Sequence, residues 1–311
     1  MEATACPELV RILKYFPEKV QSAVGVLTAS MPGREAYLSE IRLRAGAPMS
    51  VTCLDRNIFT FGGKQIICSE AEVATTLQRL CEDSVHTYSE TIKEGFVALE
   101  NGYRIGVCGR AGTDGARVKS VYGISSLSVR IPHPVTGVAR DLARTVCHGG
   151  RICAALLYSP PGVGKTTLIR DLARTLSAGP APHRAVLVDT RGELYMRSLF
   201  ADSLVDVLSG YPRAKGIEIA TRTMSPEVIF CDEIGSSEEA QAILSAQNSG
   251  VPLIATAHAD SLSRLLRRPN IRTLYDNGIF RYYIGLRRAP GETRFVYEIF
   301  DADAAGEERC G

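Results

Sequence analysis

The sequence lacks the segments that carry a protein into or across a membrane. Residues 1–14 do not combine a charged start, an apolar run and a small-residue cleavage site, so we expect no secretory leader. The longest apolar runs, such as residues 152–158, are far shorter than the roughly 20 residues of a membrane-spanning helix. We therefore expect a cytoplasmic protein.

Paired cysteines, metal-ligand spacing and a charge of one sign are absent as well. The nine cysteines stand singly and the five histidines are not spaced as metal ligands, which predicts reduced thiols. A net charge of +2 creates no overall field that would require nucleic acid or a membrane as partner. With 45% hydrophobic and 23% charged residues, the 311-residue chain has the composition of a soluble globular protein of about two domains.

Two parts of the chain differ in their patterns. In the first part, Ser69 and Glu72 form a capping box that predicts the start of a helix. Two prolines within residues 132–134 then end regular structure. We expect an N-terminal α+β domain over residues 1–140 and a second domain over residues 141–311.

The second part contains short, continuous apolar runs separated by helical patterns. Such runs indicate strands buried on both faces, and their alternation with helices indicates a mainly parallel sheet covered by helices. Polar residues follow the ends of these strands, at the edge where open α/β sheets bind their ligands. The runs are residues 153–158, 185–188, 228–231 and 253–255.

A glycine-rich segment follows the first run and consists of Ser159, Pro160, Pro161, Gly162, Val163, Gly164, Lys165, Thr166 and Thr167. The glycines let backbone N–H groups surround an anion, and the N-terminus of the next helix adds its partial positive charge. Lys165 would reach the β- and γ-phosphates, and Thr166 would be an Mg²⁺ ligand. The pattern predicts an α/β fold class with a P-loop NTPase domain of the RecA/AAA-like type.

Ser159 departs from the P-loop pattern, which has glycine at this first position. Serine resists positive φ, so Ser159 is the first position at which to look for a weakened nucleotide affinity. Two alternatives remain open for the segment: a glycine-rich turn without a ligand, and a site that binds a nucleotide without turnover.

Two carboxylates and two further polar residues end the neighbouring strands. Asp232 would hold Mg²⁺ through water, and Glu233 would polarise the attacking water as a general base. Adjacent carboxylates at the end of a buried strand would be costly without a metal nearby. Thr256 is placed to sense the γ-phosphate, and His258 follows beside the acidic strand. A structural or exposed histidine is the alternative for His258.

Asp189 and Glu193 follow the run of residues 185–188. Asp189-x-x-Gly192 resembles the switch motif of GTPases, but the chain has no guanine-reading Asn-Lys-x-Asp, which favours ATP. We interpret both residues as carboxylates near Mg²⁺ and water in the nucleotide site. A surface turn is the alternative.

Arginines form two groups. Residues 264–288 carry seven arginines and one acid and could bind nucleic acid, anionic lipid or a neighbouring subunit, or simply form a solvated face. On the predicted strands of the first domain, Arg130 is the best candidate to reach the γ-phosphate, because it is next to the domain boundary. A structural ion pair is the alternative for each strand arginine, which are Arg42, Arg44, Arg104, Arg110 and Arg130.

These segments resemble known families. PEVIFCDEIG at residues 226–235 and SGVPLIATAH at residues 249–258 are similar to the Walker B and His-box segments of type II/IV secretion ATPases. Three N-terminal stretches resemble the stage III sporulation protein AA family. They are EIRLRAGAP at residues 40–48, EGFVALENGYRIGVCGR at 94–110 and ISSLSVRI at 124–131.

The resemblance implies a ring-shaped hexamer at the cytoplasmic face of a membrane, on the mother-cell side. ATP would sit between the two domains, and N-terminal arginines would help close on it. The ring would energise a transenvelope channel assembled from membrane proteins during sporulation. The sequence departs from the secretion pattern at Asp232, where that pattern often has glycine.

We thus expect an ATP-hydrolysing motor of the secretion type, with ATP and Mg²⁺ as cofactors. A nucleic-acid-handling AAA-like ATPase is the alternative, since the arginine-rich segment would suit it; nucleic acid is not expected as a partner but stays open. A nucleotide-gated binding protein that does not cycle is a third reading, and Glu233 argues against it.

Overall fold

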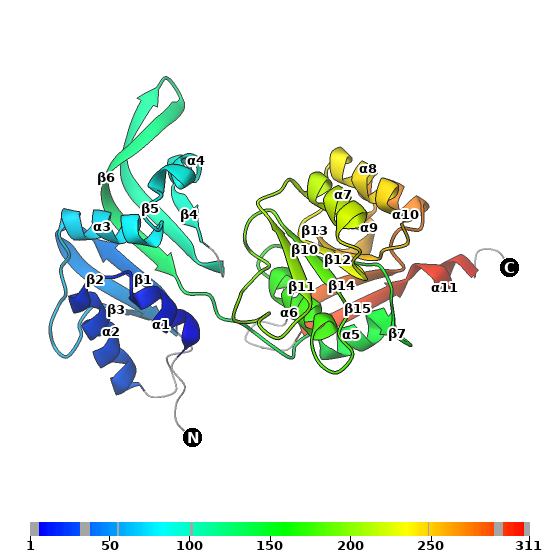
Figure 1. The fold of residues 1–311 in the computed structure, drawn as a ribbon, viewed down its shortest axis with the longest axis horizontal. Coiled ribbons are helices and arrows are strands. Elements are labelled where there is room, and N and C mark those ends of the chain that lie inside the picture. Colours follow the sequence, from blue (N-terminus) through cyan, green and yellow to red (C-terminus); the bar gives the residue numbers. More distant parts are fainter. Residues whose placement is uncertain are drawn as a thin grey trace. The chain divides into compact units, whose positions relative to one another are not determined.

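The computed structural model describes residues 6–31, 38–54, 56–99, 102–247, 249–288 and 295–307 (Figure 1). The chain divides into two compact units, residues 1–133 and residues 134–311. This division falls a few residues before position 140, because the segment after Pro134 is already tied to the second unit. There, the Ala139 N–H donates to Asp171 Oδ2 at 2.8 Å. Within the described residues, no helix has the length and apolar character needed to cross a membrane.

Unit 1 is built on a six-stranded sheet in the order β3-β2-β1-β6-β5-β4, in which neighbouring strands are antiparallel. The strands are β1 (Leu38–Arg44), β2 (Ala47–Cys53), β3 (Arg56–Ile58), β4 (Phe96–Ala98), β5 (Arg104–Asp114) and β6 (Arg117–Arg130). The helices are α1 (Pro7–Leu13), α2 (Glu18–Ser30), α3 (Glu70–Leu80) and α4 (Ser89–Lys93), with a 3-10 turn at Val85–Tyr88. Figure 1 shows the β5–β6 hairpin extending beyond the rest of this sheet.

The sheet of unit 1 has one apolar and one polar face. Ile41 and Leu43 of β1 are fully buried in the core that the helices share, whereas Arg42 between them faces the other side. Helix α3 begins at the predicted capping box. The Ser69 hydroxyl accepts a hydrogen bond from the Glu72 N–H, and the Glu72 carboxylate accepts one from the Ser69 N–H.

Unit 2 contains a seven-stranded sheet in the order β11-β10-β12-β13-β9-β14-β15, which is parallel from β11 to β14 and antiparallel between β14 and β15. Its strands are β9 (Ala155–Ser159), β10 (Ala185–Asp189), β11 (Val205–Ser209), β12 (Val228–Cys231), β13 (Leu253–His258), β14 (Tyr282–Arg288) and β15 (Phe295–Asp301); β7 (Cys147–His148) and β8 (Arg151–Ile152) form a separate pair. Its helices are α5 (Arg140–Val146), α6 (Lys165–Ser177), α7 (Arg213–Thr223), α8 (Ser237–Gln247), α9 (Leu262–Leu265), α10 (Pro269–Asp276) and α11 (Ala302–Glu307). The predicted α/β fold class is confirmed.

Helices cover both faces of this parallel sheet. Leu157 of β9 packs in a core with residues of α5 and α6. Its strand neighbours Leu156 and Tyr158 point the other way, into a core with residues of α7, α8 and α10. This arrangement explains the continuous apolar runs, because every residue of a strand between two helical layers is buried.

Helix α7 approaches the sheet closely through Gly216. A Cβ built on Gly216 would overlap Cγ1 of Val188 on β10. Only the hydrogen side chain of glycine leaves room for this contact. The glycine therefore sets the distance between α7 and the strand that ends at Asp189.

We expect Gly216→Ala to lower the free energy of unfolding by about 1–3 kcal/mol, the usual cost of overpacking a core. Chemical denaturation followed by circular dichroism measures this change. Gly25→Ala is the control, because Gly25 lies within α2 and a Cβ there would meet nothing within 4 Å. The better helix propensity of alanine should make that variant up to about 1 kcal/mol more stable. A similar gain for both variants would contradict the close packing of α7.

Candidate nucleotide-binding site

The predicted phosphate loop joins the carboxyl end of β9 to the N-terminus of α6. Gly162 has a φ of +79° and Gly164 a φ of +115°, a region that side chains with a Cβ rarely adopt. Gly164 also faces the ring of Phe295, whose Cε1 and Cζ would lie 2.9 Å from a Cβ. Conformation and space therefore both require glycine at Gly164. Thr166 follows in the first turn of α6.

Ser159 does not carry the strain that its place in the pattern suggests. It is the last residue of β9, in extended conformation, and only 1% exposed. Its hydroxyl donates to the Pro160 carbonyl at 2.8 Å. The loop turns into positive φ only at Gly162, so serine at Ser159 gives no steric reason for a weaker affinity.

Lys165 is buried against the loop it follows. Its Nζ donates to the carbonyls of Ser159 at 3.0 Å and of Pro160 at 3.2 Å. Burial lowers the pKa of Lys165, and the negative charge of Glu233 opposes this shift. Nζ also lies 2.9 Å from Nδ1 of His258.

Strand β13 brings His258 and Thr256 between the phosphate loop and the acidic pair. The strand pairs with β9 on one side, where His258 is level with Ser159, and with β12 on the other, where Ala255 is level with Cys231. Because the ammonium of Lys165 only donates, Nδ1 of His258 accepts. A neutral imidazole then carries its proton on Nε2, which contacts Oε1 of Glu233.

Glu233 is held in a strained backbone conformation. Its φ is +40°, which is unusual for a residue with a side chain and typical of functional sites. The hydroxyl of Thr256, a residue only 1% exposed, accepts the Glu233 N–H at 2.9 Å. On the carboxylate, Oε2 lies 3.0 Å from Nη1 of Arg191. Arg191 and His258 hold the carboxylate, whereas Thr256 holds the backbone of Glu233.

Asp232 is paired with a buried arginine. Both Nε and Nη2 of Arg213 donate to its Oδ1, at 3.3 and 3.2 Å. Burial raises the pKa of Asp232; Arg213 opposes this shift, and the charges of Glu193 and Asp189 add to it. Burial alone would lower the pKa of Arg213, but the carboxylates of Asp232 and Glu239 outweigh it and raise the pKa.

Asp189 organises the loop that follows β10. Its Oδ1 accepts the Glu193 N–H at 2.8 Å, and its Oδ2 accepts those of Leu194 at 3.0 Å and Tyr195 at 2.9 Å. Arg170 of α6 donates to the Leu194 carbonyl at 3.1 Å and also contacts the Glu193 carbonyl. Both oxygens of Asp189 thus serve the loop, which places the backbone of Glu193.

The donor set suits Mg²⁺ held partly by a nucleotide. Mg²⁺ in phosphoryl-transfer sites takes one or two carboxylates together with phosphate oxygens. Asp232 is a buried carboxylate that already has a cation, the guanidinium of Arg213, as its partner. Thr166 supplies a hydroxyl beside the phosphate loop. Among the described residues, no group of three or more His, Cys, Asp or Glu side chains could hold a metal ion.

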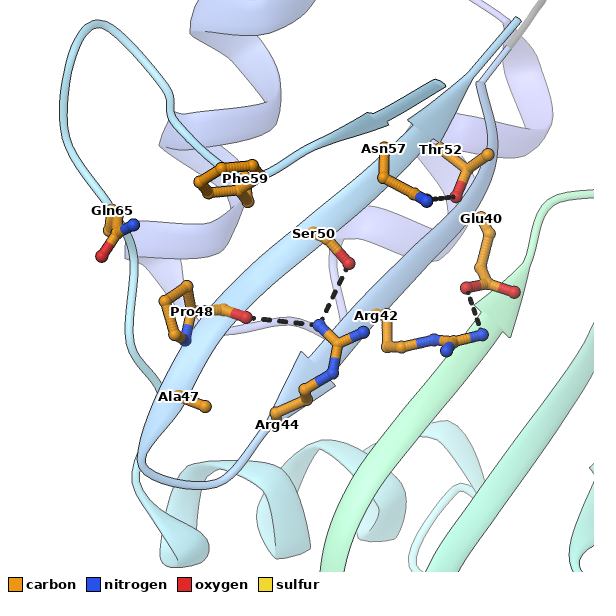
Figure 2. Close-up of a pocket in the computed structure, with 10 residues that line it drawn as sticks. All are labelled: Glu40, Arg42, Arg44, Ala47, Pro48, Ser50, Thr52, Asn57, Phe59 and Gln65. Carbon is orange, nitrogen blue, oxygen red and sulfur yellow. Dashed lines mark hydrogen bonds and ion pairs between the residues drawn. The ribbon is translucent and has the colours of Figure 1, made fainter. Parts of the chain in front are cut away.

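The arginines on the strands of unit 1 lie in a separate unit from the phosphate loop. Figure 2 shows Arg42 and Arg44 in a groove of about 610 Å³ on the polar face of the sheet. Arg42 pairs with Glu40 at 2.8 Å, and Arg44 donates to the Ser50 hydroxyl at 3.1 Å. These two arginines therefore have structural partners. Arg130 is exposed at the end of β6.

Acidic partners accompany the arginine-rich segment of residues 264–288. Arg272 pairs with Asp276 at 2.9 Å, and Arg287 pairs with Glu298 at 2.9 Å. Two further pairs join Arg264 to Asp260 and Arg281 to Asp301. These carboxylates reduce the positive field that a nucleic-acid backbone would need.

The sequence did not single out Arg170, Arg191 or Arg213. No motif marks them, because each is defined by a carboxylate or carbonyl that is distant in the sequence. Their proximity to the acidic strand depends on the fold, so the sequence alone does not reveal it.

Solved structures of an ATPase and of a pilus motor have a fold similar to that of this chain. The structure matches the Legionella pneumophila ATPase DotB with a TM-score of 0.64 and 15% identity, over 99% of this chain and 86% of that one. It matches the pilus retraction motor PilT, solved with bound ADP, with a TM-score of 0.63 and 19% identity, over 94% of this chain and 86% of that one. At such identities the likeness concerns the fold alone.

The family model for sporulation stage III, protein AA matches residues 21–303, and the chain belongs to this family. The stage III sporulation protein AA of Bacillus subtilis (strain 168) is 32% identical over 302 residues, which cover 94% of this chain and 95% of that protein. The Arabidopsis thaliana protein SEEDLING PLASTID DEVELOPMENT 1 is 34% identical over 163 residues, but these cover 49% of this chain and 22% of that protein. The resemblance expected from the sequence is confirmed.

We expect Thr256→Val to lower the free energy of unfolding by about 1–3 kcal/mol, because it leaves the Glu233 N–H without its acceptor. Thr256→Ser keeps the hydroxyl and is the matched control; it should retain most of the stability. Thermal unfolding of the two variants beside the parent protein measures the difference. If valine and serine had the same effect, the hydrogen bond from Glu233 would not be what Thr256 contributes.

Proposed function

We propose that this protein is an Mg²⁺-dependent ATPase of the secretion type that energises assembly of, or transport through, a transenvelope channel during sporulation. The observation that carries the proposal is the chain of contacts from Lys165 through His258 to Glu233. It joins the phosphate loop to a carboxylate across three neighbouring strands. Membership of the sporulation family supports the setting of this activity.

In this proposal, the loop from Ser159 to Thr167 wraps the phosphates of ATP with its backbone N–H groups. Lys165 exchanges its carbonyl partners for the β- and γ-phosphates. Mg²⁺, held by Thr166 and Asp232, would supply charge neutralisation at the phosphate oxygens. The absence of a guanine-reading motif supports ATP as the substrate.

Glu233 acts as the general base toward the attacking water. In the resting protein, Arg191 and His258 both contact its carboxylate, and these contacts fix the orientation of the carboxylate at the end of the strands. The imidazole of His258 contacts Lys165 on one side and Glu233 on the other. A movement of Lys165 from the loop to the nucleotide is therefore passed to Glu233. Thr256 positions the backbone of Glu233.

We further propose that Arg130 of unit 1 reaches the γ-phosphate. Its exposure at the end of β6 supports this role. A ring-shaped hexamer at the inner face of a membrane, on the mother-cell side, would bring such a residue to a nucleotide. Membrane proteins of the channel complex would be the partners.

We expect Glu233→Gln to bind ATP normally and to hydrolyse it about 10²–10⁴-fold more slowly, the usual contribution of a general base. Lys165→Ala should lose tight binding, because the loop then lacks its cation. Titration with a fluorescent ATP analogue and a phosphate-release assay separate the two effects. Glu238→Gln, an exposed carboxylate in the first turn of α8, is the control and should behave as the parent protein does. Unchanged hydrolysis by Glu233→Gln would overturn the assignment of the base.

We expect the mass of the purified protein to rise toward that of a ring when a non-hydrolysable ATP analogue and Mg²⁺ are added. If arginines of another domain or subunit contact the bound nucleotide, nucleotide binding favours assembly. Light scattering after size-exclusion chromatography measures the mass, and Lys165→Ala is the control that should not respond. A strict monomer in both states would contradict the ring.

A further inference from the structure

Arg213 sits between two buried carboxylates at the start of α7. Its side chain is only 13% exposed, and those of Asp232 and Glu239 are 3% and 12% exposed. Nε and Nη2 donate to Asp232 Oδ1, and Nη1 donates to Glu239 Oε1 at 3.3 Å. Guanidinium is always charged in proteins, so this is a permanent buried cation.

The two partners of Arg213 differ in the number of other hydrogen bonds that hold them in place. Oε2 of Glu239 accepts the N–H groups of Gly235 at 2.7 Å and Ser236 at 2.9 Å, which fixes Glu239 at the N-terminus of α8. Glu239 is therefore a constant partner for the guanidinium. Asp232, at the end of β12, is the carboxylate that the proposed ATPase needs for Mg²⁺.

We propose that Arg213 holds Asp232 in the resting protein and yields it to Mg²⁺ when the nucleotide binds, as a positioning residue that remains paired with Glu239. The proposal rests on the ATPase function proposed above. Both cations need the same carboxylate. Without Arg213, Asp232 would be a buried charge with no partner in the resting protein, which is a costly state.

The exchange has a consequence for α7. Gly216 packs this helix on Val188, so its body is fixed, while Arg213 is its first residue and follows Pro212. The Tyr211 carbonyl just before it accepts the Thr190 hydroxyl at 2.8 Å. Release of Asp232 therefore loosens the first turn of α7 and not the whole helix.

The test compares nucleotide binding with Mg²⁺ and with EDTA, using a fluorescent non-hydrolysable ATP analogue. The dissociation constant in EDTA divided by the dissociation constant with Mg²⁺ measures how strongly Mg²⁺ supports nucleotide binding. We expect Arg213→Met to raise this ratio about tenfold, because Mg²⁺ no longer competes with a charge-assisted hydrogen bond. Arg213→Lys should stay near the parent value. Lys215→Met removes an exposed charge from the same helix and should leave the ratio unchanged.

An unchanged ratio in a folded Arg213→Met protein that still binds the analogue would overturn the proposal. Failure of the parent protein itself to bind the analogue would instead refute the ATPase function, and the inference with it. Because Arg213→Met leaves two buried carboxylates unpaired, the variant could fail to fold. A second measurement therefore uses the parent protein alone.

Hydrogen exchange of the parent protein, read by mass spectrometry, follows the first turn of α7. We expect faster exchange in residues 213–217 when Mg²⁺ is added to the protein bound to the analogue, and no such change when Mg²⁺ is added without nucleotide. Residues 218–223 of the same helix are the internal control. Equal exchange of the first turn with and without Mg²⁺ in the nucleotide complex would contradict the exchange of partners.

Discussion

The parallel register of β9, β13 and β12 is the constraint on which the site depends. With β13 in the middle, His258 is level with Ser159 and can touch both the lysine of the phosphate loop and the acidic pair. Thr256 and His258 are two residues apart and share one face of the strand, while Ala257 between them is buried in the core on the other side. A shift by one residue would turn both polar side chains away from the site. The apolar cores on the two faces of the sheet prevent that shift.

The charged groups at this edge of the sheet have partners within the protein. Asp232 is matched by Arg213, Glu233 by Arg191, and Asp189 by backbone N–H groups. Buried charges are tolerated only with such partners. In the proposed function, a nucleotide would therefore enter a site whose hydrogen bonds are already made, and its affinity would reflect an exchange of partners. Lys165 would take part in the same exchange, because its ammonium contacts two carbonyls and an imidazole in this structure.

Local patterns in the sequence predicted much of this fold. The capping box at Ser69, the buried strands and the glycine-rich turn before Lys165 each depend on neighbouring residues, and each is found in the structure. The sequence pattern did not show that Ser159 ends strand β9, because it gives the order of the residues but not where the strand ends. Arg191 and Arg213 had no local signal. Their partners are brought to them by strand order, which no short stretch of sequence contains.

The phosphate loop also depends on the far end of the chain. Phe295 begins β15 at the edge of the sheet, yet its ring lies against Gly164. The same glycine must adopt a φ of +115° for α6 to begin. A side chain at this position would therefore be unfavourable for two reasons: the positive φ of the backbone and the overlap with the aromatic ring. Because the loop rests on Phe295, the shape of the loop and the position of the paired strands β14 and β15 are linked. In the proposed function, a nucleotide that moves the loop would therefore also act on this edge of the sheet.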